Sequence, residues 1–305
     1  IYEALVTLPI TELTRAANGK PAAPRKRVKD GNGATVCILP CSDGYAAISP
    51  REEHQWQAWL DVMGRPAWGD DPRYATRAGR VDHWDDVHAL MGEWSRHRTR
   101  SDIADAAQAA HVPSFALRRP FEHLASEQLL ARQFFKNFET GGKRYKIPDS
   151  PFALALSQAP GNHESPAASR RHLPLSGVRI LDFSWVIAGP TTTRYLAALG
   201  ADVIKVEAPG RGDPGRTSEL HTVLGQGKRG IVLNLKMEEG RQLARDLAQH
   251  SHVLVENFAT GVMERFGLDA KTLRATNPGL SYVSASGLGR EGPQAGAVAY
   301  GTLLQ

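Results

Sequence analysis

The stretch VRILDFSWVIAGPTTTRYLAALGADVIKVEAP, residues 178–209, decides the fold of this protein. Short apolar runs at 179–183 and 202–207 flank a segment of helical character at 190–199. Two such runs separated by a helix predict a strand–helix–strand unit, the building block of a parallel sheet. A unit of this kind usually opens an α/β domain, yet here it begins past the middle of a chain of 305 residues. The chain is therefore expected to hold the end of one unit and the start of the next.

The second half continues this alternation. Strands are predicted at 179–183, 202–207, 230–235, 252–257 and 281–286, with helices near 190–199, 238–250 and 268–276. Because strands joined by helices form parallel sheets with right-handed crossovers, the predicted fold class is α/β with a Rossmann-like parallel sheet. Ligands of such sheets bind beyond the carboxyl ends of the strands. The candidate functional loops are therefore 184–189, 208–216, 257–261 and 287–293.

The first half has the pattern of a small α+β domain at about 35–125, followed by a return segment. Two apolar runs around the turn residues Ser42–Gly44 predict a hairpin over 35–49, and a capping box at Ser49 predicts a helix start. Apolar residues then recur at helical spacing, which predicts core positions: Trp56, Trp59, Leu60 and Met63; Val87, Leu90, Met91 and Trp94; Ile103, Ala106, Ala107 and Ala110. A further helix is predicted over 124–135, and a short strand that turns back over 141–154.

A linker is predicted between the two halves. Residues 156–173, SQAPGNHESPAASRRHLP, are rich in Pro, Ser, Gly and charged residues. The predicted organisation is therefore a first unit at 1–155, a linker at 156–173 and a second unit at 174–305.

Composition excludes several classes of protein. With 41% hydrophobic and 23% charged residues, the chain reads as soluble and globular. It has no apolar run long enough to span a membrane and no signal peptide at its start, so no membrane partner is expected. Two cysteines, Cys37 and Cys41, give no disulfide framework, which predicts a cytoplasmic location. Their C-x₃-C spacing alone is weak evidence for a metal, and none is expected.

The charge of the chain and its glycine pattern exclude or disfavour several classes of ligand. The net charge of +5 is mild, and the basic run at 25–29 has no interleaved aromatics, so no nucleic acid is expected. The loop FSWVIAGP has one glycine, Gly189, where a G-x-G-x-x-G nucleotide motif needs three. Glu207 ends the second strand as a ribose-binding acid would, but without the glycines NAD or FAD binding is disfavoured.

Cationic and polar groups in or near the candidate loops favour a phosphorylated, adenine-bearing ligand. Lys228 enters a strand, Asn257 ends one, and Arg265 follows after a short turn. Each alone reads as a solvated cation or a strand-end cap. Together they offer cations for phosphates, and apolar residues such as Val186 and Ile187 offer a surface for a ring.

Four blocks in order resemble the opening of class III CoA-transferases, the family of formyl-CoA transferase. These blocks are LSGVRILDFSWVIAGPTTTRYLAALGADVIKVEAP, GQGKRGIVLNLKMEEGRQL, VENFATGVMERFGLDAKTL and NPGLSYVSASGLGREGP. Residues 1–155 resemble the second half of the same family, through IYEAL, the segment DGYAAISPREEHQWQAWLDVMGRPAWGDDPRYATRAGRV and RYKIPDSPFALA. The resemblance implies the middle of a tandem protein whose two fused units interlace as the family's paired subunits do, with a further homodimer as the alternative.

The resemblance also implies a mechanism, with acyl-CoA and a small carboxylic acid as substrates. An aspartate carboxylate attacks an acyl-CoA to give a mixed anhydride, and the CoA thiolate returns to give an aspartyl-CoA thioester. The acceptor acid then takes the CoA. That aspartate is expected about thirty residues beyond Gln305, and its counterpart in the first unit before Ile1. No aspartate of this chain is nominated as catalytic, Asp182 and Asp213 are read as structural, and the chain alone is expected to be inactive.

The implied coenzyme A site is carried over residue by residue. Val186 and Ile187 match the loop beside the pantetheine, and Lys228 matches a lysine that contacts CoA. The element around the adenine and phosphates is matched by Asn257, Phe258, Arg265 and Phe266. The sequence departs from the family pattern at Ala208, at Ala259-Thr260-Gly261 and at Ser286, where the family has an arginine, R-P-G and a lysine.

Three alternatives stay open. A tandem member that transfers CoA to dimethylsulfoniopropionate and then releases dimethyl sulfide is one. A racemase of 2-methylacyl-CoA is disfavoured because QAGAVAYG at 294–301 has no His–Asp pair. A non-catalytic scaffold that only binds CoA is the third. The acceptor acid, the oligomeric state and the stability of the chain alone do not follow from the residues.

Overall fold

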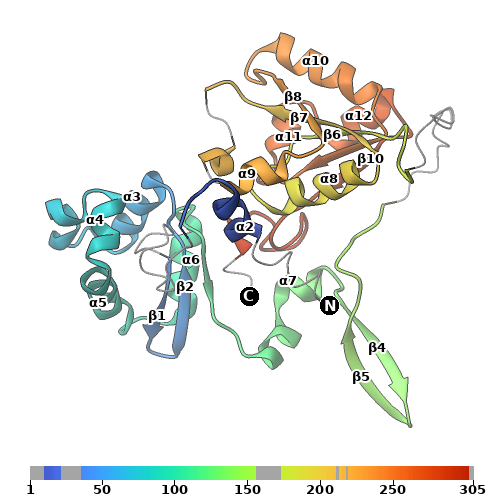
Figure 1. Ribbon diagram of the computed structural model, residues 1–305. Coiled ribbons are helices and arrows are strands. Elements are labelled where there is room, and N and C mark those ends of the chain that lie inside the picture. The colour runs from blue at the N-terminus through green and yellow to red at the C-terminus, as the bar shows by residue number, and fades with distance from the viewer. Residues whose placement is uncertain (1–9, 22–35, 156–172, 211–212, 218, 302–305) are drawn as a thin grey trace. The chain divides into compact units, whose positions relative to one another are not determined.

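The chain forms two compact units that do not follow the order of the sequence. The computed structural model describes residues 10–21, 36–155, 173–210, 213–217 and 219–301 (Figure 1). One unit, here called the sheet unit, combines Ile1–Ala22 with Phe152–Ser286. The other, the small unit, combines Ala23–Pro151 with Gly287–Gln305. The predicted linker at 156–173, except its last residue, and the basic run at 25–29 lie outside the described residues.

The sheet unit is built on five parallel strands, which confirms the predicted α/β class. They are β6 (Arg179–Asp182), β7 (Asp202–Glu207), β8 (Lys228–Val232), β9 (Val253–Glu256) and β10 (Ser281–Ser284), in the spatial order β10-β9-β6-β7-β8. The predicted positions hold for four of them. The strand predicted at 230–235 instead begins at Lys228 and ends at Val232, because the left-handed turn at Gly227 (φ +75°) lets pairing with Val203 begin at Lys228.

Alternating side chains of the central strands enter two separate cores, as a sheet covered on both faces requires. Leu181 and Leu254 pack under α10 (Glu238–Gln249), α11 (Val262–Arg265) and α12 (Ala270–Thr276). Their neighbours Ile180 and Val255 pack on the other face, against Leu196 of α8 (Ala188–Ala198). Figure 1 shows α10 and α8 on opposite sides of the strands. The same unit contains α2 (Ile10–Ala17), which contacts α9 (Glu219–Leu224), and the short helix η5 (Pro214–Thr217).

The small unit has a three-stranded antiparallel sheet covered by helices. Strands β1 (Cys37–Cys41), β2 (Gly44–Ile48) and β3 (Ser114–Ala116) pack with α3 (Glu53–Val62), α4 (Arg77–Asp82), α5 (Trp84–Ser95) and α6 (Arg100–Ala109), with short helices η2 (Ala67–Asp70) and η3 (Pro72–Tyr74) between them. The predicted hairpin is confirmed. Trp56, Trp59, Met91 and Ile103 are fully or almost fully buried, so the helical stripes enter the core as predicted. Ala106 is the exception: it is exposed, and Ala104 is buried on that helix instead. Cys37 and Cys41, which do not form a disulfide, occupy the two ends of β1.

Two predicted elements of the small unit are wrong. Helix α3 is capped by Glu52 and not by Ser49, because the Gln55 side chain accepts the main-chain N–H of Arg51 and Glu52 at 3.0 and 3.2 Å. The helix predicted over 124–135 is a 3₁₀ turn, η4 (Pro120–Ala125), and one short helix, α7 (Glu127–Ala131).

The chain leaves α7 through a left-handed residue, Gln133 (φ +51°), and enters a hairpin. Its strands are β4 (Phe135–Thr140) and β5 (Lys143–Pro148), of which the sequence predicted only the second. Gly141 and Gly142, both at positive φ, form the turn that joins them. Such a turn matches the twist of a two-residue hairpin loop.

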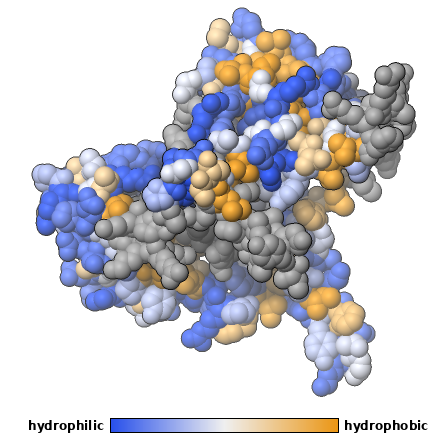
Figure 2. Space-filling view, viewed as in Figure 1, coloured by the Kyte–Doolittle hydropathy of each residue, from blue (hydrophilic) through white to orange (hydrophobic). Residues whose placement is uncertain are grey.

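The surface is largely hydrophilic in Figure 2, with apolar residues gathered near β8 and α10. Exposed Val232, Met237 and Leu243 come from this region. None of the helices in the described part of the chain combines the length and the apolar character that a membrane crossing requires.

Two helical glycines of the small unit provide a test of its packing. A Cβ at Gly79 of α4 would lie 2.2 Å from the Arg73 carbonyl oxygen, whereas at Gly92 of α5 its nearest neighbour is a Pro40 carbon at 3.9 Å. Gly79→Ala should lower the free energy of unfolding by about 1–3 kcal/mol through overpacking. Gly92→Ala should leave it unchanged or raise it by up to about 1 kcal/mol, because alanine favours helix. Urea unfolding followed by tryptophan fluorescence measures both, and equal effects would contradict the packing.

Candidate functional site

The carboxyl edge of the sheet contains a switch point between β6 and β9, where the strand order reverses direction. Ligands of open α/β sheets bind at such a point. The loops that follow these two strands are tied together by one side chain. The Asn257 carboxamide oxygen accepts the Trp185 N–H at 2.7 Å, and its NH₂ group donates to the Trp185 carbonyl at 2.8 Å. The Trp185 ring packs edge-on against Phe258, with centroids 5.3 Å apart.

The loop after β6 is held in a strained form by a buried aspartate. Asp213 accepts the N–H of Val186 with both carboxylate oxygens, at 3.1 and 3.0 Å, and the N–H of Gly215 at 2.8 Å. Val186 adopts φ +66°, which costs a β-branched residue on the order of 1–2 kcal/mol. Its side chain and that of Ile187 are 36% and 52% exposed. The loop therefore presents two apolar side chains to solvent, and strain of this kind is concentrated at functional sites.

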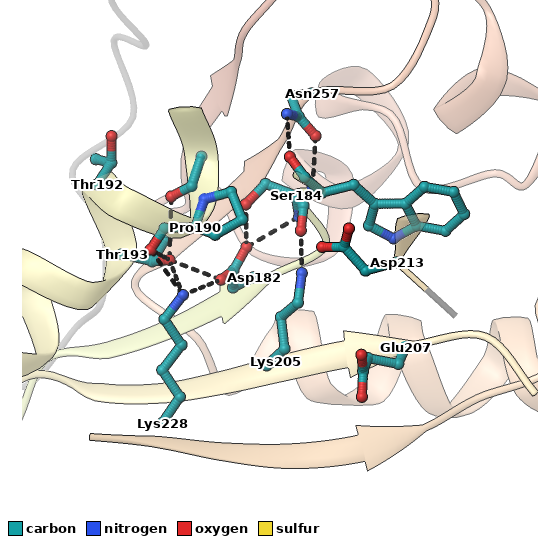
Figure 3. A network of polar contacts seen from close by, with 12 residues as sticks. Asp182, Ser184, Pro190, Thr192, Thr193, Lys205, Glu207, Asp213, Lys228 and Asn257 are labelled. Atoms are coloured by element: carbon teal, nitrogen blue, oxygen red, sulfur yellow. Dashed lines mark hydrogen bonds and ion pairs between the residues drawn. The ribbon is translucent and has the colours of Figure 1, made fainter. Parts of the chain in front are cut away.

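Beneath the loop lies a buried network of charges (Figure 3). Asp182, the last residue of β6, is fully buried. Its carboxylate accepts the main-chain N–H of Ser184 at 2.9 Å, the hydroxyl of the same serine, the Thr193 hydroxyl at 2.6 Å and the Lys228 ammonium at 3.1 Å. Lys205 donates to the Ser184 carbonyl. Burial opposes ionisation of Asp182, but the charges of Lys205 and Lys228 and the hydroxyl donors outweigh it and lower its pKa.

All three N–H groups of the Lys228 ammonium are used within this network. Its ammonium donates to Asp182, to the Pro190 carbonyl at 2.9 Å and to the Thr193 hydroxyl at 2.7 Å, and its side chain is 3% exposed. An ammonium has three N–H groups, so none is left for a ligand phosphate in this arrangement. Burial lowers the pKa of Lys228, and the nearby Asp182 charge opposes that shift.

Gly189, the only glycine of the loop FSWVIAGP, serves packing. A Cβ there would lie 2.2 Å from Cβ of Ser184. Only glycine lets the first turn of α8 approach the strand end this closely, and this approach places Thr193 within reach of Asp182.

The other predicted site residues lie on or beside α11. Arg265 is exposed, and its guanidinium forms no ion pair with any of the described residues. Its Nη1 would lie 3.5 Å from a Cβ on Gly261, the left-handed N-cap of α11. Phe266 and Phe258 are half-buried against the core under α10. Arg265 is therefore the cation of the predicted set that is available to a ligand.

Sequence reasoning missed the residues that hold the site together. Lys205 was read only as part of a strand, and Asp213 only as part of a turn, although GRGDPGR is a signal for a loop ordered by its aspartate. The expectation that Asp182 and Asp213 are structural agrees with their hydrogen bonds. Glu207 pairs with Arg216, while its buried Oε1 has no hydrogen-bond partner among the described residues and lies 4.0 Å from His221 Nε2. In the described ranges, no three His, Cys, Asp or Glu residues are grouped as a metal site would require.

Lys228→Met should destabilise the sheet unit, because it leaves a buried carboxylate with only Lys205 as a nearby cation. The expected loss is about 3 kcal/mol of unfolding free energy. Residue-resolved amide exchange of β6 and β7 measures it without interference from the small unit. The double variant Asp182→Asn/Lys228→Met is the control and should be more stable than Lys228→Met alone. A Lys228→Met protein as stable as the parent would contradict the pairing.

The strain at Val186 has a neighbouring control in Ile187, whose φ is −124°. Val186→Gly relieves the left-handed strain, whereas Ile187→Gly only adds backbone freedom to the unfolded chain. Val186→Gly should therefore be less destabilising than Ile187→Gly by about 1 kcal/mol. The same amide-exchange measurement compares them, and the reverse order would show that Asp213 imposes no strain.

Comparisons with known proteins find similar sequences among CoA-transferases. A protein of Mycobacterium tuberculosis named "Probable CoA-transferase Rv1866" is 26% identical over 318 residues, which are 95% of this chain and 40% of that protein. The acetyl-CoA:oxalate CoA-transferase of Acetobacter aceti is 41% identical over 140 residues, 43% of this chain and 36% of that protein. The crystal structure of Rv3272 from M. tuberculosis is 35% identical over 42% of this chain and 38% of its own, with a TM-score of 0.40.

The chain thus spans less than half of the length of each of these relatives. A sequence model described as CoA-transferase family III matches residues 1–171 and 175–305, which is nearly all of the sequence. The chain therefore belongs to CoA-transferase family III.

Proposed function

We propose that this chain is the CoA-binding part of a family III CoA-transferase, which moves CoA from an acyl-CoA to a carboxylic acid. The observation that carries the proposal is the switch point between β6 and β9. There Asn257 ties two loops together, exposed Val186 and Ile187 offer an apolar surface, and Arg265 offers an exposed cation that has no carboxylate partner among the described residues. CoA joins an adenine nucleotide with charged phosphates to a pantetheine arm that has methylene and methyl groups between its amides, so it can use both kinds of surface.

The contacts proposed for Val186, Ile187 and Arg265 follow from the exposure of their side chains, and those proposed for Phe258 and Phe266 from their place beside α11. Val186 and Ile187 take the pantetheine, because they are the exposed apolar residues of the loop after β6. Phe258 and Phe266 flank the adenine, and Arg265 binds a phosphate through charge-assisted hydrogen bonds. Asn257 acts by fixing the Trp185 main chain, since its carboxamide oxygen and one N–H are used there.

Lys228 is assigned a supporting part in this proposal. Its three donors are used by Asp182, Thr193 and Pro190, so it fixes the loop on which CoA lies and does not touch the phosphates. A lysine that binds a phosphate would instead present a solvated ammonium.

The proposed chemistry uses an aspartate nucleophile outside this chain. Its carboxylate attacks the thioester carbonyl, and the CoA thiolate leaves to give a mixed anhydride. The thiolate then attacks the aspartyl carbonyl of the anhydride and expels the donor acid, which leaves an aspartyl-CoA thioester. The acceptor carboxylate attacks this thioester and displaces the CoA thiolate to give a second mixed anhydride. The thiolate finally attacks the acceptor's acyl carbonyl, which forms the acceptor's CoA thioester and frees the aspartate carboxylate. Asp182 and Asp213, the aspartates that order the loop after β6, both accept several protein hydrogen bonds, so neither is free to attack.

A tandem parent protein, with two interlaced units, is part of the proposal. The family match falls in two segments, 1–171 and 175–305. The M. tuberculosis relative aligns with 95% of this chain and yet extends over more than twice the aligned length. Both findings favour a longer protein in which the end of one unit precedes the start of the next.

The acceptor acid is the open part of the proposal. Relatives are named for oxalate, glutarate and D-citramalate as CoA acceptors or donors. A panel for the parent protein should hold these acids and dimethylsulfoniopropionate, with dimethyl sulfide release as the sign of a coupled cleavage.

Titration calorimetry with CoA tests the site. Arg265→Gln should weaken CoA binding about 10- to 100-fold, because a hydrogen bond to a charged group contributes about 1.5–3 kcal/mol. Lys146→Gln, which removes the same charge from exposed β5 of the small unit, should leave affinity unchanged. An equal loss of CoA affinity in both variants would show that the effect comes from net charge and not from a contact of Arg265. Unchanged CoA affinity in Arg265→Gln would refute the assigned phosphate contact. Turnover by the chain alone would refute the proposal that the nucleophilic aspartate lies outside it.

A further inference from the structure

The segment that follows β10 belongs to the small unit and not to the sheet that it leaves. Residues 287–300 form neither helix nor strand. Within the segment, the main chain makes two turn hydrogen bonds, Ala295 N–H to the Gly292 carbonyl at 3.2 Å and Ala297 N–H to the Gln294 carbonyl at 3.0 Å. Because the segment has no helix or strand to fix its path, its contacts with other residues of the small unit decide where it lies.

Gln128 of α7 supplies the first anchor. It is 2% exposed, and its side chain bonds three main-chain groups of the segment. The NH₂ group donates to the carbonyls of Leu288 at 2.8 Å and Glu291 at 2.7 Å, and the oxygen accepts the N–H of Gln294 at 2.7 Å. A carboxamide has two N–H groups and one oxygen, so every polar atom of this side chain is used on the segment.

Gln108 of α6 repeats the arrangement ten residues from the first contact. Its NH₂ group donates to the carbonyls of Val298 at 3.0 Å and Ser114 at 2.9 Å, and its oxygen accepts the N–H of Val298 at 2.9 Å. The carboxamide thus pairs with both polar groups of one residue, as a neighbouring strand would. Further on, the Arg51 guanidinium lies 4.8 Å from the centroid of the Tyr300 ring.

Two glycines of the segment are required where it meets these anchors. Gly289 and Gly292 have φ of +95° and +89°, which disfavours any side chain. A Cβ at Gly292 would lie 2.6 Å from the Gln128 carboxamide oxygen, and a Cβ at Gly289 would lie 2.5 Å from Nε of Arg132. Gln128 cannot move aside without losing its three hydrogen bonds. Gly296, in contrast, has open space around its Cβ position.

We propose that the small unit is a docking surface for the main chain of residues 287–300, with Gln108 and Gln128 as the residues that recognise it. Because both glutamines bond main-chain groups, recognition depends on the backbone path and on glycine at 289 and 292. Those two glycines then serve docking, which is a different use from cradling a ligand. This inference does not rest on the proposed CoA site, whose residues belong to the sheet unit.

Residue-resolved amide hydrogen exchange on the whole chain tests the proposal. Gln128→Leu keeps the size of the side chain and removes its hydrogen bonds, and should speed exchange of the Gln294 N–H at least tenfold. Gln108→Leu should do the same for Val298. Gly292→Ala should reproduce the Gln128→Leu result, whereas Gly296→Ala, the matched control, should change neither amide.

Two further measurements, amide exchange of β2 and CoA affinity, separate loss of docking from other effects. Exchange of the β2 amides, which pair with β1 and β3, reports whether the small unit is still folded. If it is, unchanged exchange at Gln294 in Gln128→Leu overturns the proposal, and so does an equal effect of Gly292→Ala and Gly296→Ala. CoA affinity should be unchanged in Gln108→Leu, Gln128→Leu and Gly296→Ala; a loss of affinity in Gly292→Ala without faster exchange would assign the glycine to the ligand and overturn its role in docking.

Discussion

A carboxylate with no access to solvent fixes the carboxyl edge of the sheet. Asp182 ends β6, and each of its partners comes from a different part of the unit: the loop through Ser184, α8 through Thr193 and β8 through Lys228. An ion pair buried this deeply adds little net stability, but the loss of one partner is costly. The network therefore constrains geometry, because any shift of the loop, the helix or the strand would break a hydrogen bond that water cannot replace.

The cations of the site differ in burial and therefore in their role. Lys205 and Lys228 are buried and hold the loop from beneath, whereas Arg265 is exposed and has no carboxylate partner among the described residues. On the loop itself, Asp213 keeps Val186 in a left-handed conformation that turns two apolar side chains outward. The sheet unit thus offers a prearranged surface, and a prearranged surface lowers the entropic cost of binding a flexible ligand such as CoA.

The sequence predicted those elements in which buried apolar residues recur at a regular spacing along the chain. Trp56, Trp59 and Met91 follow a helical spacing, and the strands of the sheet unit are short apolar runs, so both cores were found. The prediction of a helix over 124–135 was wrong for two reasons that the local spacing does not show. Gln128 bonds to Leu288, which is far away in the chain, and the residues after Gln133 pair with β5 as a strand. The sequence likewise did not indicate that Lys228 is buried and paired, because its partner Asp182 is 46 residues distant and residue type alone does not reveal which groups its ammonium contacts.

Amide exchange of the whole chain with and without CoA tests the central claim most directly. If the switch point between β6 and β9 is the CoA site, CoA should slow exchange in the two loops tied by Asn257, at residues 185–188 and 257–266. Exchange in β1 and β2 of the small unit should stay the same. Slowed exchange confined to other segments, or no change at saturating CoA, would contradict the account.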